Sequence, residues 1–122
     1  MPKRTTIRAS QKRSIWSARG DDLSLRTLAT GDQPGACWTT LAIALHALVA
    51  IDDYEQGVSW AIALGGDADT NAAVAGALLG CRHGEQAIPP RWLDRLSDRE
   101  RIEQAAGALL EMTAQDTQDN RA

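Results

Sequence analysis

Apolar residues recur at helical spacing along most of the chain, and no stretch alternates apolar and polar residues as a half-buried strand does. The sequence therefore predicts an all-α fold. The expected helices cover 21–30, 36–51 (largely buried, with apolar residues close to all round), 54–64, 70–83, a short segment from 90 and a last segment that opens at Ser97.

Turn and capping residues separate these helices. The run Gly31-Asp32-Gln33-Pro34-Gly35 ends the first one. Asp52-Asp53 precedes the third, where acids favour the helix N-terminus, so we interpret this pair as a cap. Gly84 is the expected C-cap of the helix over 70–83. Ser97 and Glu100 have the spacing of a capping box for the last helix.

Gly76 and Gly80 lie four residues apart, on one face of the helix predicted over 70–83. A glycine in a helix interior costs about 1 kcal/mol relative to alanine. Two of them therefore indicate that a neighbouring helix packs closely against this face.

The length of 122 residues favours one domain, and 43% hydrophobic with 24% charged residues is typical of a folded globular protein. A net charge of -3 gives no general attraction to nucleic acid or to a membrane surface. The most apolar run, 41–51, is interrupted by His46 and is far shorter than the about 20 residues that cross a membrane. We expect no membrane partner.

Cys37 and Cys81 lie in apolar runs and form no Cys-x-x-Cys pair. We interpret them as buried thiols in a reducing compartment. No apolar segment of a secretory signal follows the N-terminus. The expected location is therefore cytoplasmic.

Residues 1–20 carry six of the 13 basic residues and no acid. We interpret this segment as a basic, mobile arm. An organellar transit peptide has a similar composition, and a nucleic-acid-binding arm is a further alternative. Because no aromatic ladder or reading motif accompanies the basic residues, nucleic acid is not the expected partner.

The most informative stretch is Gly65-Gly66-Asp67-Ala68-Asp69-Thr70. Its two glycines let the backbone turn where a side chain would clash. Its two carboxylates and its hydroxyl lie at the start of a helix and are the oxygen ligands that Mg²⁺ prefers. The alternative is that Asp69 or Thr70 simply caps this helix, since both residue types are common N-caps.

Residues 64–80 closely resemble the C-terminal signature of the ADP-ribosylglycohydrolase family, which includes the dinitrogenase-reductase activating glycohydrolases. The resemblance continues through His83-Gly84 and Ile88-Pro89-Pro90-Arg91-Trp92 and covers about residues 36–96. It implies the C-terminal part of that family's fold, an orthogonal multi-helix bundle. It also implies that Trp92 closes the core over the helix that follows the acidic motif.

In that family two Mg²⁺ ions hold the ribose of an ADP-ribosyl group and activate water that hydrolyses an N- or O-glycosidic bond. The resemblance implies that Asp67, Asp69 and Thr70 are metal ligands, with Asp69 shared between the two ions and Mn²⁺ as an alternative metal. It points to Gly65 and Gly66 as substrate-binding positions, and it assigns no catalytic residue. The implied substrate is an ADP-ribosylated protein or a small ADP-ribosyl compound.

The family completes its metal site with an N-terminal triplet of a hydroxyl residue and two aspartates. Arg19-Gly20-Asp21-Asp22 has glycine in place of the hydroxyl residue, and Asp52-Asp53 follows Ile51, so neither fits. We therefore expect a C-terminal fragment that supplies half of a site and pairs with a missing N-terminal half or with itself. The alternative is a non-catalytic all-α remnant or binding module. The expected divisions are the arm over 1–20, a partial domain over 21–113 and a polar tail over 114–122.

The two histidines are interpreted as structural. His46 lies on a buried helix with no second His or Cys at ligand spacing. His83 stands at the C-terminal end of a helix, where its imidazole complements the helix dipole. A catalytic base is the alternative for His83.

Overall fold

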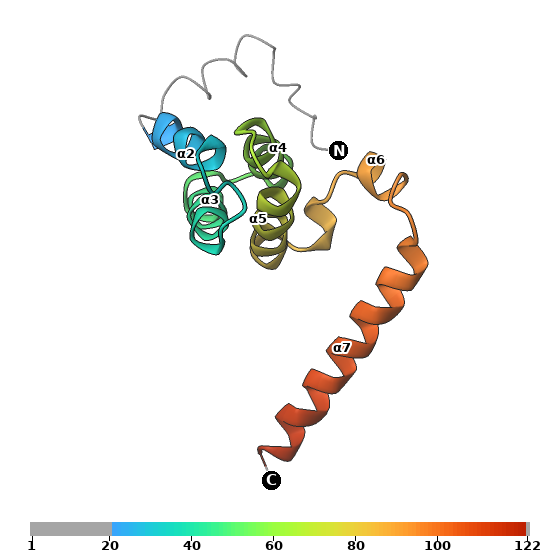
Figure 1. The fold of residues 1–122 in the computed structure, drawn as a ribbon. Coiled ribbons are helices and arrows are strands. Elements are labelled where there is room, and N and C mark those ends of the chain that lie inside the picture. The colour runs from blue at the N-terminus through green and yellow to red at the C-terminus, as the bar shows by residue number, and fades with distance from the viewer. Residues whose placement is uncertain (1–20, 122) are drawn as a thin grey trace. The chain divides into compact units, whose positions relative to one another are not determined.

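A computed structural model describes residues 21–121, and the basic arm predicted over 1–20 lies outside them (Figure 1). This range contains no strand, so the all-α prediction is confirmed. None of its helices has the length and apolar character needed to cross a membrane. The elements are α2 (Asp21–Thr30), α3 (Cys37–Ala50), α4 (Tyr54–Ala63), α5 (Ala68–His83), the 3₁₀ turn η1 (Glu85–Ala87), α6 (Pro90–Leu93) and α7 (Arg99–Asp119).

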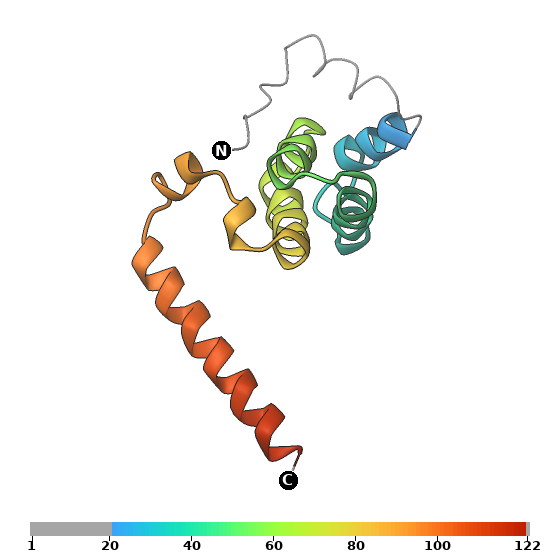
Figure 2. The same ribbon diagram turned by 180° about the vertical axis from the view of Figure 1, so that it is seen from behind.

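The chain divides into two compact units between Ala87 and Ile88. In the first unit α5 packs against both α3 and α4, and Figure 2 shows these helices from behind. Most of the buried side chains are small, which allows the helix axes to lie close together. The core consists of Ala29, Ile43, Ala44, Ala47, Trp60, Ala61, Leu64, Ala72, Ala75 and Leu79.

The close approach predicted for Gly76 and Gly80 is confirmed, and the neighbour is α4. A Cβ placed on Gly76 would lie 3.4 Å from the hydroxyl of Tyr54 and 3.5 Å from a methyl group of Val58. A Cβ on Gly80 would lie 3.9 Å from the ring of Tyr54. Burial between α4 and α5 raises the pKa of the Tyr54 hydroxyl above its ordinary value.

The prediction that α3 is buried nearly all round is wrong. Its buried residues lie on one face, and four large apolar side chains spaced along the helix are exposed: Trp38, Leu41, Leu45 and Val49. The prediction that Cys37 and Cys81 are buried is also wrong, since both thiols are exposed and free. Apolar periodicity shows which residues share a face of a helix, but it does not show which face a neighbouring helix covers.

The second unit holds α6 and α7. The capping box predicted from Ser97 is wrong by one residue, because Asp98 is the N-cap of α7 and makes no side-chain cap hydrogen bond. Asp98 has a positive φ of 55°, a conformation that aspartate tolerates better than most residues. Within this unit the guanidinium of Arg91 lies 5.8 Å from the centre of the Trp92 ring. The expected packing of Trp92 over the helix that follows the acidic motif stays a prediction. The domain boundaries also stay predictions.

Candidate functional site

The acidic motif forms a tight turn between α4 and α5. Both glycines need the left-handed conformation, with φ values of 84° for Gly65 and 66° for Gly66. A side chain would be strained at either position. The turn is closed by a hydrogen bond from the backbone N–H of Gly65 to the carbonyl of Ile62. The two glycines thus place Asp67 immediately before the first residue of α5.

The alternative reading of Asp69 and Thr70 as helix caps is wrong. The structure places the N-cap two residues earlier than expected, at Asp67, and α5 begins at Ala68. The Asp67 side chain makes no cap hydrogen bond, although its backbone carbonyl accepts from the N–H of Asn71 at 3.0 Å. Asp69 and Thr70 lie in the first helical turn and are exposed. Asp67 therefore holds the N-cap position without a cap hydrogen bond from its side chain, and Asp69 lies inside the first helical turn.

The acidic turn lowers the pKa of one of its two aspartates. The pKa of Asp69 is lowered, chiefly by a side-chain hydrogen bond with Asp67. The backbone N–H groups of Thr70 and of Asp69 itself add to this lowering. The turn therefore places two acidic side chains two residues apart, with Asp67 half-buried and Asp69 exposed.

The end of α2, the loop after it and the start of α3 surround this turn. A Cβ on Gly66 would overlap the backbone carbonyl of Ala29, so only glycine fits there. A Cβ on Gly35 would overlap the carboxylate of Asp67 and lie 3.2 Å from its Cγ. These contacts fix both the backbone and the first carboxylate of the motif.

One buried hydrogen bond joins α3 to the first turn of α5. The Thr40 hydroxyl donates to Oδ1 of Asn71 at 2.8 Å, and Asn71 is fully buried. The Nδ2 amide of Asn71 finds no partner in the part of the chain that the structure describes. Sequence reasoning missed this pair and Gly35. Two signals in the sequence were available. Thr40 is a polar residue in the largely apolar run of α3, and Asn71 is an amide residue beside the alanines of α5.

The sequence profile of the ADP-ribosylglycohydrolase family matches residues 4–119. The chain belongs to the ADP-ribosylglycohydrolase family. Relatives in this family agree with that match. An uncharacterized protein of Archaeoglobus fulgidus is 41% identical over 70 residues, covering 57% of this chain and 22% of that protein.

Two relatives with functional names also match. The ADP-ribosylarginine hydrolase Tri1 of Serratia proteamaculans is 36% identical over 77 residues, which are 63% of this chain and 21% of that protein. The ADP-ribosyl-[dinitrogen reductase] glycohydrolase of Rhodospirillum rubrum is 35% identical over 80 residues, which are 63% of this chain and 27% of that protein. The chain thus spans about a quarter or less of the length of these relatives. No solved structure matches it.

The acidic turn presents the side chains of Asp67, Asp69 and Thr70. Its donor set fits Mg²⁺, because two carboxylates and a hydroxyl are hard oxygen ligands. Within residues 21–121 no group of three or more His, Cys, Asp or Glu side chains comes together to hold a metal ion.

Asp52, Asp53 and His46 make contacts that do not involve the acidic turn. Asp53 caps α4 by accepting a hydrogen bond from the N–H of Gln56 at 2.8 Å, and Asp52 pairs with Arg82 at 2.8 Å. The His46 ring stacks on Trp60 with 4.9 Å between ring centres. His83 ends α5. At a rise of about 1.5 Å per residue it lies roughly 20 Å along the helix from Asp69 and cannot share its chemistry.

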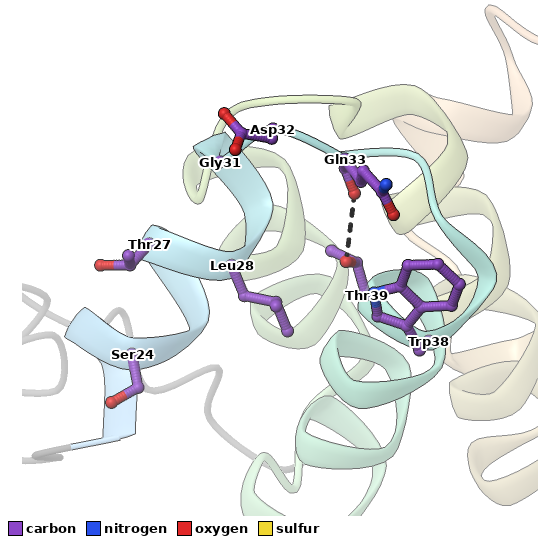
Figure 3. A pocket seen from close by; sticks show the side chains of 8 residues that line it. All are labelled: Ser24, Thr27, Leu28, Gly31, Asp32, Gln33, Trp38 and Thr39. Atoms are coloured by element: carbon purple, nitrogen blue, oxygen red, sulfur yellow. Dashed lines mark hydrogen bonds between the residues drawn. The ribbon is translucent and has the colours of Figure 1, made fainter.

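An open pocket with a volume of about 430 Å³ lies between α2, the loop after it and the start of α3, and Figure 3 shows the side chains that line it. It is lined by Ser24, Thr27, Leu28, Gly31, Asp32, Gln33, Trp38 and Thr39. Asp32 is its one charged lining residue, and the Thr39 hydroxyl donates to the carbonyl of Gln33 at 3.2 Å. None of the predicted site residues lines it, so this pocket is not the candidate site.

Proposed function

We propose that this chain is part of a Mg²⁺-dependent hydrolase that removes ADP-ribosyl groups by breaking an N- or O-glycosidic bond. The observation that carries the proposal is the acidic turn, in which two glycines with positive φ place Asp67 at the N-cap position and Asp69 in the first turn of α5, while the Asp67 side chain makes no cap hydrogen bond. Family membership and relatives named as ADP-ribosylarginine and ADP-ribosyl-[dinitrogen reductase] hydrolases support the substrate class.

In this proposal Asp67, Asp69 and Thr70 would hold the metal. A bound Mg²⁺ pair supplies charge that orients the ribose and lowers the pKa of water. Gly65 and Gly66 are the proposed substrate-binding positions and would act through their backbone, because the Ala29 carbonyl already fills the space beside Gly66. The chain's own contribution is to hold two carboxylates at one fixed point and to leave the approach to them open.

The proposed site is a half-site that further polypeptide completes. The support is the donor set: two carboxylates and a hydroxyl leave most of a six-oxygen shell to be filled. The partner would be an N-terminal portion of such a hydrolase or a second copy of this chain. The substrate would be an ADP-ribosylated protein or a small ADP-ribosyl compound, in the cytoplasm.

A complementation assay tests the proposal. The chain is mixed with the Rhodospirillum rubrum relative from which the matching segment has been removed, and release of ADP-ribose from an ADP-ribosylated protein is measured. We expect Mg²⁺-dependent release with the natural chain and its loss with Asp69→Asn. Asp69 is exposed in the first helical turn, and asparagine keeps the shape of its side chain, so the variant should fold.

A non-catalytic binding module is the second candidate, and the small number of metal donors among the described residues favours it. The same assay separates the two. No release of ADP-ribose from a complex that forms would support the binding module. Binding of two Mn²⁺ ions with submicromolar affinity by the isolated chain would instead show a complete site and overturn the half-site proposal.

A further inference from the structure

We propose that Gly35 is a positioning residue for the metal site: the space left by its missing side chain holds the Asp67 carboxylate beside Asp69. The inference rests on the proposed metal role of these two aspartates. Gly35 belongs to the loop between α2 and α3, about thirty residues before the acidic motif, so no local sequence pattern links it to the site.

The contact between Gly35 and Asp67 is direct. A Cβ at position 35 would overlap Oδ2 of Asp67, lie 3.2 Å from Cγ and 3.6 Å from Cβ of the same side chain. Atoms of no other residue are among the three nearest to that Cβ. The carboxylate therefore occupies the volume that any other residue at position 35 would need.

The backbone conformation gives no separate reason for a glycine at this position. Among residues 21–121 the glycines with positive φ are Gly65, Gly66 and Gly84, and Gly35 is not one of them. Alanine would fit the backbone and would lower the conformational entropy of the unfolded chain. The feature that alanine would disturb is the place of the Asp67 carboxylate.

The loop that carries Gly35 is held against the acidic turn and cannot easily move aside. On one side the N–H of Ala36 donates to the carbonyl of Gln33 at 3.2 Å, which closes the loop. On the other side Thr40 is joined to Asn71 by their buried hydrogen bond. With the loop fixed at both places, an added methyl group at position 35 would displace the Asp67 side chain rather than the backbone.

The test is Gly35→Ala in the full chain, with Gly76→Ala as the matched control. Both changes add one methyl group and reduce the entropy of the unfolded chain equally. At Gly76 the new methyl meets Tyr54 and Val58 at 3.4–3.5 Å, which is ordinary contact, and it does not touch the acidic turn. A carboxylate is the mobile end of a side chain, so Gly35→Ala should fold, with an unfolding midpoint within about 4 °C of the natural chain.

Two measurements follow. Three-bond NMR couplings to Cγ of Asp67, without metal, report its χ1 angle, and we expect a change in Gly35→Ala and none in Gly76→Ala. Mn²⁺ binding, followed by water-proton relaxation, should weaken by about 10- to 100-fold in Gly35→Ala only, as for other residues that orient metal ligands. In an Asp67→Ala background, Gly35→Ala should cause no further loss.

The outcomes separate this inference from the proposed function. An unchanged Asp67 χ1 angle in a folded Gly35→Ala chain overturns the positioning role, whatever the metal affinity. A changed angle in a chain that binds no Mn²⁺ supports the positioning role and counts against the metal function. Equal weakening of Mn²⁺ binding by Gly35→Ala and Gly76→Ala also overturns the inference, because the effect would then not pass through Asp67.

Discussion

Gly57 of α4 and Leu79 of α5 are packed so closely that a Cβ on Gly57 would lie 2.5 Å from Cδ1 of Leu79. Leu79 is fully buried and cannot turn its methyl group into solvent. Interior packing is dense, so no empty space nearby accepts the displaced atom. This contact, more than Gly76 and Gly80, sets the separation of the two helices that flank the acidic turn.

Gly57→Ala should therefore destabilise the chain, although alanine is the better helix former. Overpacking costs about 1–3 kcal/mol. Helix propensity returns about 1 kcal/mol. We expect a net loss of up to about 2 kcal/mol in urea unfolding, recovered in part by Leu79→Val. Gly76→Ala, which meets no such overlap, is the control and should be neutral or stabilising. Equal gains from both glycine substitutions would show that the packing at Gly57 is loose.

Arg82 joins the end of α5 to the end of α3. Its guanidinium donates to the carbonyl of Leu48 and pairs with Asp52, whose side chain is 88% exposed. α3 has no basic residue in its own last turn, so Arg82 satisfies a carbonyl that would otherwise lack a partner. We expect Arg82→Met to cost about 0.5–1.5 kcal/mol. Asp52→Asn should cost less than about 0.5 kcal/mol, because exposed ion pairs contribute little.

Unfolding of both variants in 0.05 M and 0.5 M salt checks this assignment. If the bond to Leu48 dominates, the cost of Arg82→Met should persist at high salt, whereas a contribution from the ion pair should be screened. Similar costs for Arg82→Met and Asp52→Asn would contradict the capping role.

The sequence contained enough information for the helices and for the acidic turn. Local rules decide these features: Gly65 and Gly66 need positive φ, Asp53 caps α4, and Gly84 ends α5, all as predicted. Each of these depends on residues a few positions apart. The start of α5 was predicted two residues late, because Asp67 occupies the N-cap position through its backbone without a side-chain cap bond.

Features that depend on distant residues were not predicted. The contact of Gly35 with Asp67 and the bond of Thr40 to Asn71 join α3 or its preceding loop to a turn some thirty residues later. Periodicity also could not show that Cys37 and Cys81 lie on exposed helix faces. A helical pattern fixes which residues share a face, whereas packing between helices decides which face is covered.

The lowered pKa of Asp69 predicts a particular acid dependence. Because the folded-state pKa lies below the unfolded one, the carboxylate contributes stability at neutral pH. This contribution is lost as the pH falls from the ordinary carboxyl range through the folded-state pKa. A ¹³C NMR titration should show Asp69 ionising below an ordinary aspartate. Asp67→Ala should raise the Asp69 pKa, because the largest cause of the lowering is removed, but the two backbone N–H groups should keep part of it. An unchanged Asp69 midpoint in Asp67→Ala would contradict the contact between the two carboxyl groups.

The buried bond between Thr40 and Asn71 should be measurable by a double-mutant cycle. Thr40→Val keeps the shape of the side chain but removes the donor, and it leaves a fully buried amide with neither end paired in the described part of the chain. An unpaired buried polar group costs about 1–3 kcal/mol. Thr40→Ser keeps the hydroxyl and should lose about 1 kcal/mol or less, for one methyl group.

Asn71→Leu removes the amide, so the valine at position 40 should then be tolerated. We expect Thr40→Val combined with Asn71→Leu to be more stable than the sum of the single changes by about 1 kcal/mol or more, measured by urea unfolding. Additive costs would mean that the two side chains act independently and that another contact holds α3 against the first turn of α5. A positive coupling would show that a residue pair outside the motif stabilises the acidic turn. Asn71 directly follows Asp69-Thr70, and its N–H donates to the carbonyl of Asp67.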